Sequence, residues 1–398
     1  MATALTTASP APTHSASEAD PFRLYRRVGT VAALALLFAV LAEFFWNARA
    51  PSDRDFVSFW GAARLALEGT PHLAYNLEVL HALQSEAVTF GSGKMPFPYA
   101  PAFMLLVLPF GLLNFAAAMA LWSLSTFAVY FAVVRRIFPD SGLLAAAFPA
   151  VFVNAAVGQN GFVMAAIFIG GLLLLPTRPF AAGLLLGCLV LKPQLALLLP
   201  VAVLAARAWP AVAGAAVSAI GLLVLGLAVF GWQASQAWVA QMPLYVEIGR
   251  NGLVGWHKLA SVYAAMRQIG LGQTAAFAVH IAVAAAAAWA VWKVWRSDAE
   301  FAAKAAMLAA ATMLISPYLF LYDTVFLIVP FLWLATARAS PGLLVGLWFL
   351  PLVSIAQIAT VAGPINFAPV VPIALTALIW RQLHPRTTSG LERAAPSV

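Results

Sequence analysis

Charged residues are scarce in this sequence. Asp, Glu, Lys and Arg make up 9% of its 398 residues, whereas 63% are hydrophobic. A soluble domain is about a quarter charged, so this composition excludes an ordinary soluble domain and predicts an integral membrane protein. The net charge of +8 fits that class, because Lys and Arg collect in the cytoplasmic loops of membrane proteins. It does not indicate nucleic acid as a partner.

Cysteine is almost absent as well. The single Cys188 lies in an apolar run, which excludes an internal disulfide and favours a small buried side chain. The sequence has no Walker A loop, no dinucleotide fingerprint, and no HExxH or GxSxG motif. We therefore expect no metal and no cofactor. If the protein is an enzyme, its substrate reaches it from the membrane or from the outer compartment.

The apolar segments predict an all-α polytopic fold of about 12 transmembrane helices, since each crossing needs about 20 apolar residues. We expect disordered tails at 1–22 and 385–398 around a single transmembrane domain at 23–384. Several segments are short and interrupted by Pro or Gly, as in broken helices that line a cavity. The candidate segments are 27–46, 114–134, 142–153, 160–176, 179–191, 194–206, 211–230, 272–296, 304–316, 319–337, 341–357 and 364–380.

Basic residues of the short loops predict the orientation. With a cytoplasmic N-terminus most of them fall inside, so both termini are expected in the cytoplasm. Two long loops, 47–98 and 231–271, then lie outside. If the segment 99–113 crossed the membrane, the positive-inside bias of the basic residues would be inverted. We therefore expect a half-helix at 99–113 instead of a full crossing. In the first loop, the apolar spacing predicts an amphipathic helix from Phe59 to Leu67 at the membrane surface, and a second helix at 77–88.

Polar residues that interrupt the apolar segments fall together on the predicted outer side. A carboxylate kept at the edge of a membrane is costly and is often functional. These residues are Asp53, Asp55, Asn154, Gln159, Asn160, Lys192, Gln194, His257, Lys258, Tyr318, Tyr322 and Asp323. Their convergence on one face indicates a common site.

Each of these residues also admits a purely structural role. Asp53 or Asp55 can cap the helix that begins near Phe56, and Lys192 can reach to the membrane interface. The Gln159–Asn160 pair can form a turn before a helix. In the same way, His257 can be a surface residue, Asp323 can pair with a base, and Arg64 can pair with Glu68 in solvent.

Several runs follow one another along the chain at 55–69, Tyr75, 97–101, 158–161, 183–194 and 316–323. Together, and in this order, they resemble the motifs of glycosyltransferase family 87 over roughly residues 30–380. The family is similar to polyprenol-phosphate-mannose-dependent mannosyltransferases with a GT-C fold. The resemblance implies an inverting transferase that moves a hexose, with mannose as the first candidate, from a polyprenyl-phosphate donor. It implies action at the outer face of the bacterial inner membrane on a glycolipid, glycan or protein acceptor.

The resemblance also implies roles for single residues. Asp55 takes the place of the catalytic base in the first outer loop. Some relatives have a histidine at or just after the Ser-Pro motif, where this sequence has Tyr318. The expected ligands of the donor phosphate are Lys192, Gln194, Arg64, His257 and Lys258. The supporting polar residues are Gln159, Asn160, Tyr318 and Asp323.

Two other classes of function stay open at this point. Broken helices with polar groups also suit a secondary transporter. A non-catalytic lipid-binding protein of the cell envelope is the third alternative. The polar groups gather on one face and no matched halves are visible, which favours the transferase.

Overall fold

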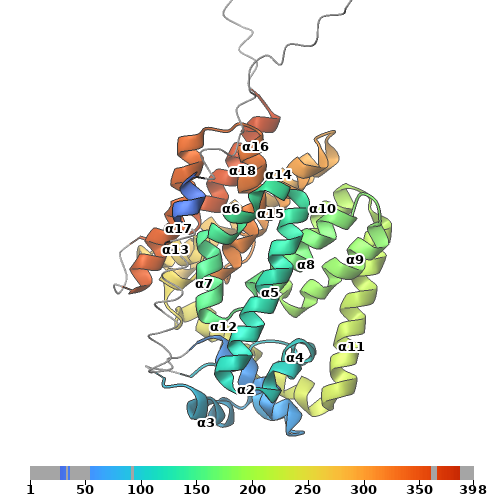
Figure 1. The fold of residues 1–398 in the computed structure, drawn as a ribbon, viewed down its shortest axis with the longest axis vertical. Helices are drawn as coiled ribbons and strands as arrows, with labels where there is room; N and C mark the ends of the chain where they lie inside the picture. The colour runs from blue at the N-terminus through green and yellow to red at the C-terminus, as the bar shows by residue number, and fades with distance from the viewer. Residues whose placement is uncertain (1–26, 33–34, 36–53, 91–93, 360–364, 386–398) are drawn as a thin grey trace, which may run out of the picture.

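The computed structural model describes residues 27–32, 35, 54–90, 94–359 and 365–385. Among them the protein is built from helices, which confirms the predicted class (Figure 1). The predicted tail 1–22, Asp53, most of the first predicted span and all but the first residue of the predicted C-terminal tail lie outside the described residues.

Helices occur at the predicted positions along the described chain. The α-helices are α2 (Phe56–Leu67), α3 (Leu77–Ala87), α4 (Ala102–Val107), α5 (Phe115–Ile137), α6 (Gly142–Ala147), α7 (Pro149–Val157), α8 (Gly161–Leu174), α9 (Pro179–Gly187), α10 (Leu199–Ala205), α11 (Trp209–Ala240), α12 (Met242–Asn251), α13 (Val262–Gln268), α14 (Gln273–Arg296), α15 (Phe301–Thr312), α16 (Ile328–Thr336), α17 (Pro341–Ala359) and α18 (Val370–Leu383). The 3-10 segments are η1 (Pro71–Tyr75), η2 (Leu108–Leu112), η3 (Pro139–Ser141), η4 (Cys188–Leu191), η5 (Pro193–Leu195), η6 (Trp256–Lys258) and η7 (Leu321–Leu327).

Three helical stretches of the described chain are long and apolar enough to cross a membrane: α5, α11 continued into α12, and α14. The helices α6 and α7, bent by 59° at a break, are a fourth candidate. The other apolar helices are shorter than 18 residues, except α17, which has 19 residues and a proline inside it at Pro351. Proline begins several of them and cannot continue a preceding helix, which accounts for many of the breaks. Apolar helices of this kind indicate a membrane protein, while the number of crossings stays a prediction.

The helix α2 was expected to be amphipathic, with one face exposed at the membrane surface; instead most of the helix is buried within the protein. Nine of its 12 residues are buried, and α3, α4, η1 and η2 pack around it. Its Phe59 ring lies 5.0 Å from Phe103 and 5.8 Å from Trp122, centroid to centroid. Aromatic contacts of this kind add to the burial of apolar area. The second predicted helix is confirmed as α3.

The region predicted as the second outer loop is largely helical. The long helix α11 bends at Gly231, whose φ of 80° is the left-handed conformation that glycine adopts without strain. Beyond this bend it runs on to Ala240 and is followed by α12, η6 and α13. Figure 1 shows α2, α3, α4 and α12 at one end of the molecule, away from α16 and α18.

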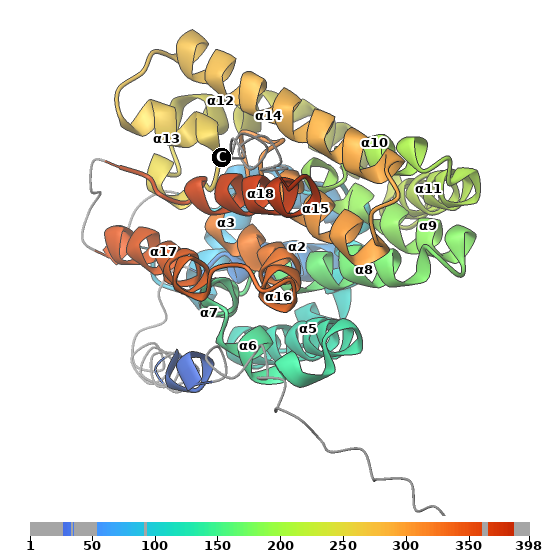
Figure 2. The same ribbon diagram turned by 90° about the horizontal axis from the view of Figure 1, so that it is seen from above.

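Small residues let α9 and α11 approach closely. A Cβ atom at Gly183 would lie 2.1 Å from the carbonyl oxygen of Ala211, and one at Gly214 would lie 2.2 Å from that of Phe180. Gly187 completes a Gly-x-x-x-Gly spacing on α9, a pattern that brings helix backbones together in membranes. Figures 1 and 2 both show the two helices side by side at one edge. This contact fixes the start of η4, and hence the position of Lys192 just after it.

Candidate functional site

A hydrogen-bonded network of polar side chains joins four breaks between helices. The breaks are the start of α2, the turn between α7 and α8, the junction of η4 and η5, and the start of η7. Each interrupts an apolar stretch, so its polar groups must find partners within the protein. The structure brings together Asp55, Gln159, Asn160, Lys192 and Asp323 from these four places.

Asp55 precedes α2 and is half-buried. Its side chain makes no capping hydrogen bond to the α2 backbone, so the capping alternative does not account for it. Instead its Oδ2 accepts a hydrogen bond of 2.9 Å from Nε2 of Gln159, 104 residues further along the chain. The contact holds the carboxylate in one orientation.

The orientation of the Gln159 amide follows from its neighbours. Its Oε1 accepts from the backbone N–H of Asn160 at 3.2 Å and from the Tyr99 hydroxyl at 3.4 Å. Because the amide oxygen faces two donors, the NH₂ group must face Asp55. These partners decide which end of the Gln159 amide is oxygen and which is nitrogen. Gln159 therefore acts on Asp55 as a donor.

The turn between α7 and α8 is clamped by Asn154. Its Nδ2 donates to the carbonyl oxygen of Gln159 at 3.0 Å, and its Oδ1 accepts from the N–H of Gly161 at 2.8 Å. Gly158 takes the left-handed conformation with a φ of 68°, which ends α7 and turns the chain. The turn thus presents Gln159 and Asn160 to the network from a fixed backbone.

Lys192 and Asp323 form a buried ion pair, with 2% and 0% of their side chains exposed. The Lys192 ammonium donates to Oδ1 of Asp323 at 2.6 Å and to Oδ1 of Asn160 at 3.0 Å. It also lies 4.6 Å from the centre of the Tyr322 ring. The second oxygen of Asp323 accepts from the N–H of Phe320 at 3.1 Å. Removal of one partner from such a pair leaves an uncompensated buried charge and is strongly destabilising.

The two carboxylates of the network, Asp55 and Asp323, both affect the pKa of the Tyr99 hydroxyl. Burial raises the pKa of the Tyr99 hydroxyl well above its ordinary range, and the charges of Asp323 and Asp55 raise it further, while a hydrogen bond with Asn160 opposes them. The hydroxyl therefore stays protonated and serves as a donor to Gln159. Both acidic groups lie near enough to this hydroxyl to act on it.

The remaining residues predicted for the site lie outside this network. Arg64 is nine residues beyond Asp55 on α2, about 13 Å along the helix axis, and its guanidinium lies 5.6 Å from the centre of the Trp60 ring. His257 and Lys258 are in η6, half-buried and exposed respectively. Burial, and then Lys258, lowers the pKa of His257, which favours the neutral imidazole. Gln194 is half-buried in η5.

Tyr318 packs between the elements that follow α11. Its ring lies 6.3 Å from that of Tyr263, and a Cβ atom at Gly249 on α12 would meet it at 2.6 Å. The segment around it is tied to the start of α13, because Ser261 Oγ, at the N-cap of that helix, donates to the carbonyl oxygen of Pro317 at 2.6 Å. Tyr318 therefore packs against α12 and α13 and is not part of the buried network.

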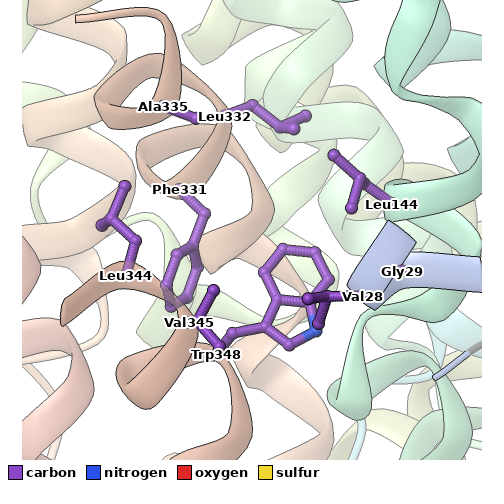
Figure 3. Close-up of a pocket in the computed structure, with 9 residues that line it drawn as sticks. All are labelled: Val28, Gly29, Leu144, Phe331, Leu332, Ala335, Leu344, Val345 and Trp348. Carbon is purple, nitrogen blue, oxygen red and sulfur yellow. The ribbon is translucent and has the colours of Figure 1, made fainter. Parts of the chain in front are cut away.

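Two cavities accompany these elements. The first, about 20 Å³, is lined by apolar side chains of α6, α16, α17 and residues 28–29, with no ionisable group (Figure 3). It is too small for a sugar or a lipid chain. The second is an open hollow of about 680 Å³ along α12, lined by Met242, Pro243, Val246, Glu247, Arg250 and Asn251. Of these two cavities in the described part of the chain, the second is large enough for a substrate group and offers charged contacts.

No group of three or more His, Cys, Asp or Glu side chains that could hold a metal ion occurs among the described residues. The polar network has two carboxylates, but the buried one is bound by the Lys192 ammonium. The expectation of a metal-independent site remains a prediction.

The sequence analysis did not assign a role to Tyr99, Asn154 or Tyr322. Tyr99 stands in a proline-rich run, where rigid backbone presents an aromatic side chain, and this was the available signal. Asn154 and Tyr322 were recognised as polar interruptions only. Their contacts join segments far apart in the chain, which local spacing does not reveal.

The comparisons with known proteins concern the middle of the chain. The model of glycosyltransferase family 87 matches residues 97–317, more than half of the 398 residues. This range holds Gln159, Asn160 and Lys192, whereas Asp323 lies shortly after its end and Asp55 lies well before its start. No curated protein and no solved structure matches the chain.

Proposed function

Because the chain belongs to glycosyltransferase family 87, we propose that it is an integral-membrane inverting hexosyltransferase with Asp55 as the catalytic base. The donor is a polyprenyl-phosphate hexose, with mannose as the first candidate. The acceptor is a hydroxyl of a glycolipid, a glycan or a protein. The observation that carries the proposal is the half-buried Asp55 carboxylate, oriented by Gln159 where four helix breaks meet.

The proposed reaction is a single displacement. Asp55 removes the proton from the acceptor hydroxyl as its oxygen attacks the anomeric carbon of the donor sugar. The bond between that carbon and the phosphate oxygen breaks, and the polyprenyl phosphate leaves with the bonding electrons. This is the general-base logic of inverting glycosidases, with a sugar hydroxyl in place of water. General-base help of this kind is worth about 10²–10⁴ in rate.

The leaving phosphate needs cationic or hydrogen-bonding partners as its charge develops. Lys258, which is exposed, and His257, which is half-buried, stand beside the Tyr318 segment and suit this role. Arg250 in the hollow along α12 is a further cation on the same side. We place the phosphate there rather than at Arg64, which lies at the other end of α2 from Asp55.

The site belongs, in this proposal, to the outer leaflet of a bacterial inner membrane. The donor's prenyl chain lies among the broken helices, where each buried CH₂ contributes about 0.8 kcal/mol. Both termini are cytoplasmic under the positive-inside bias of the short loops.

The test is transfer of labelled hexose from polyprenyl-phosphate-mannose to a membrane lipid extract, with the purified full-length protein in detergent. Asp55→Asn keeps the shape of the side chain and removes the base, so transfer should fall by about 10²–10⁴. Asp140→Asn is the matched control, because Asp140 is an exposed carboxylate in η3, which follows the C-terminal end of α5 and is not part of the network. Undiminished transfer by Asp55→Asn would contradict the base assignment. A wild-type protein inactive with every polyprenyl-phosphate sugar would contradict the proposed function.

A further inference from the structure

The most deeply buried charges of the network are those of Lys192 and Asp323, and no step of the proposed reaction uses them. The sequence favoured Lys192 as a ligand of the donor phosphate, because a lysine among apolar helices must face something. In the structure it faces Asp323, and 2% of its side chain is exposed. A phosphate that reached this ammonium would have to displace the carboxylate or sit beside it, and two anions sharing one site repel each other.

The contacts of the pair lead toward the proposed base. The Lys192 ammonium binds Oδ1 of Asn160, whose side chain is fully buried. The backbone N–H of Asn160 holds Oε1 of Gln159, and Nε2 of Gln159 holds the Asp55 carboxylate. Each link is a hydrogen bond of 3.2 Å or less. The ion pair thus fixes the turn that orients Asp55.

The pair also joins parts of the chain that nothing local would hold together. Lys192 lies between two 3-10 segments with an extended φ of −145°, and Asp323 is in the first turn of η7, 131 residues further on. Both positions interrupt apolar helices, where the backbone gains fewer regular hydrogen bonds. A neutral ion pair at this point ties η5, η7 and the start of α8 into one unit.

We infer that Lys192 is a positioning residue: paired with Asp323, it fixes the Gln159–Asn160 turn that orients Asp55, and it does not bind the donor phosphate. The inference rests on the proposed function for its kinetic readout. The inference distinguishes two possible roles of Lys192, which are to position the Gln159–Asn160 turn or to bind the donor phosphate. Neutral hydrogen-bonding residues can replace the pair, whereas a phosphate ligand must keep its charge.

The experiment is a double-mutant cycle in the full-length protein purified in detergent. Lys192→Gln and Asp323→Asn each leave a buried charge without its partner, so each should melt at a lower temperature than the wild type. The transfer rate constant kcat of the Lys192→Gln variant should fall by about 10²-fold through misplacement of Asp55. Its KM for polyprenyl-phosphate-mannose should not change.

The double variant decides between the roles. Lys192→Gln with Asp323→Asn leaves no buried charge and keeps an N–H donor for Asn160, so melting temperature and kcat should both recover most of the loss. If Lys192 held the donor phosphate, the double variant would stay as inactive as Lys192→Gln, and KM would rise about tenfold or more with the loss of a charged hydrogen bond. Either of these results overturns the inference. So does a double variant that melts no higher than the single variants.

An exposed ion pair supplies the control. Lys94 and Glu78 form a salt bridge with 34% and 77% of their side chains exposed. The double variant Lys94→Gln with Glu78→Gln should keep both melting temperature and kcat, because exposed pairs contribute little. If wild-type protein transfers no sugar, the proposed function fails, and the melting temperatures alone still measure the coupling of Lys192 to Asp323.

Discussion

Gly161 offers the sharpest test that the turn before α8 controls the site. It is buried at the first position of α8, and a Cβ atom there would lie 2.5 Å from Oδ1 of Asn154 and 2.6 Å from the carbonyl oxygen of Tyr322. Each oxygen would have to move by about 0.8 Å or more to reach an ordinary van der Waals distance. One belongs to the clamp of the turn and the other to the backbone of η7, so Gly161→Ala pushes apart two of the four breaks.

The size of the effect follows from the contacts. Loss of the 2.8 Å hydrogen bond from Gly161 to Asn154 leaves a buried acceptor unsatisfied, which costs about 1–3 kcal/mol. Alanine regains about 1 kcal/mol because it is the better helix former. We therefore expect a net loss of stability of up to about 2 kcal/mol. Displacement of Gln159 by such a distance should lower kcat by about 10²-fold.

The assay compares Gly161→Ala with the same substitution in open space. A Cβ atom at Gly221 on α11 meets nothing within 4 Å, so Gly221→Ala should keep kcat and melt no lower than the wild type. Transfer of labelled mannose and thermal melting in detergent are measured for both variants. A Gly161→Ala protein with the kcat and melting temperature of the wild type would refute the argument. Equal losses of kcat and melting temperature in both variants would show that these helices are generally sensitive to a change from glycine to alanine, and that the effect is not specific to the turn.

Two further predictions concern the packing and the hydroxyl beside Gln159. Gly183→Val places side-chain atoms against the carbonyl oxygen of Ala211, where even a Cβ atom would lie 2.1 Å away, so we expect a destabilisation of about 1–3 kcal/mol, seen as a lower melting temperature than for Gly221→Val. Tyr99→Phe removes a hydrogen bond to Gln159, so kcat should fall by roughly fivefold, corresponding to about 1 kcal/mol. Burial raises the pKa of the Tyr99 hydroxyl above its ordinary value of 10.0. Above pH 10 the hydroxyl therefore ionises in the unfolded chain but not in the folded protein. The contribution of Tyr99 to the stability of the folded protein is thus present below pH 10 and is lost as the pH rises further. Melting curves should therefore show a weaker decline above pH 10 for Tyr99→Phe, and an unchanged decline would contradict this account.

The meeting of polar residues from distant segments could be anticipated from the sequence. Lys192 and Asp323 each interrupt an apolar stretch, and a charge placed there must find a partner or an aqueous site. Their mutual pairing could not be anticipated, because 131 residues separate them and either could have faced a substrate. The sequence pattern identifies which groups need partners, while the tertiary fold decides which partners they get.

The position of α2 shows a different limit. Its apolar spacing marks one buried face, and this led to the expectation of a helix on the membrane surface. The remaining face is covered by η2 and by α4, whose Phe103 stacks on Tyr99 with ring centres 4.2 Å apart. Helical periodicity reports only how apolar residues are distributed around one helix. It does not report whether a second layer, here the proline-rich run before α4, folds over it.

The arrangement of charges explains why Asp55, rather than Asp323, suits the role of the base. Both carboxylates belong to the network, but Asp323 is fully buried and is the counter-charge of Lys192. If Asp323 took the proton of the acceptor, the buried ammonium would lose its partner in the same step, at a cost of about 3–5 kcal/mol. Protonation of Asp55 leaves the pair intact, and its half-buried position lets the proton return to solvent after transfer. The buried pair can hold the helix breaks in place throughout the reaction only if the proton goes to the other carboxylate.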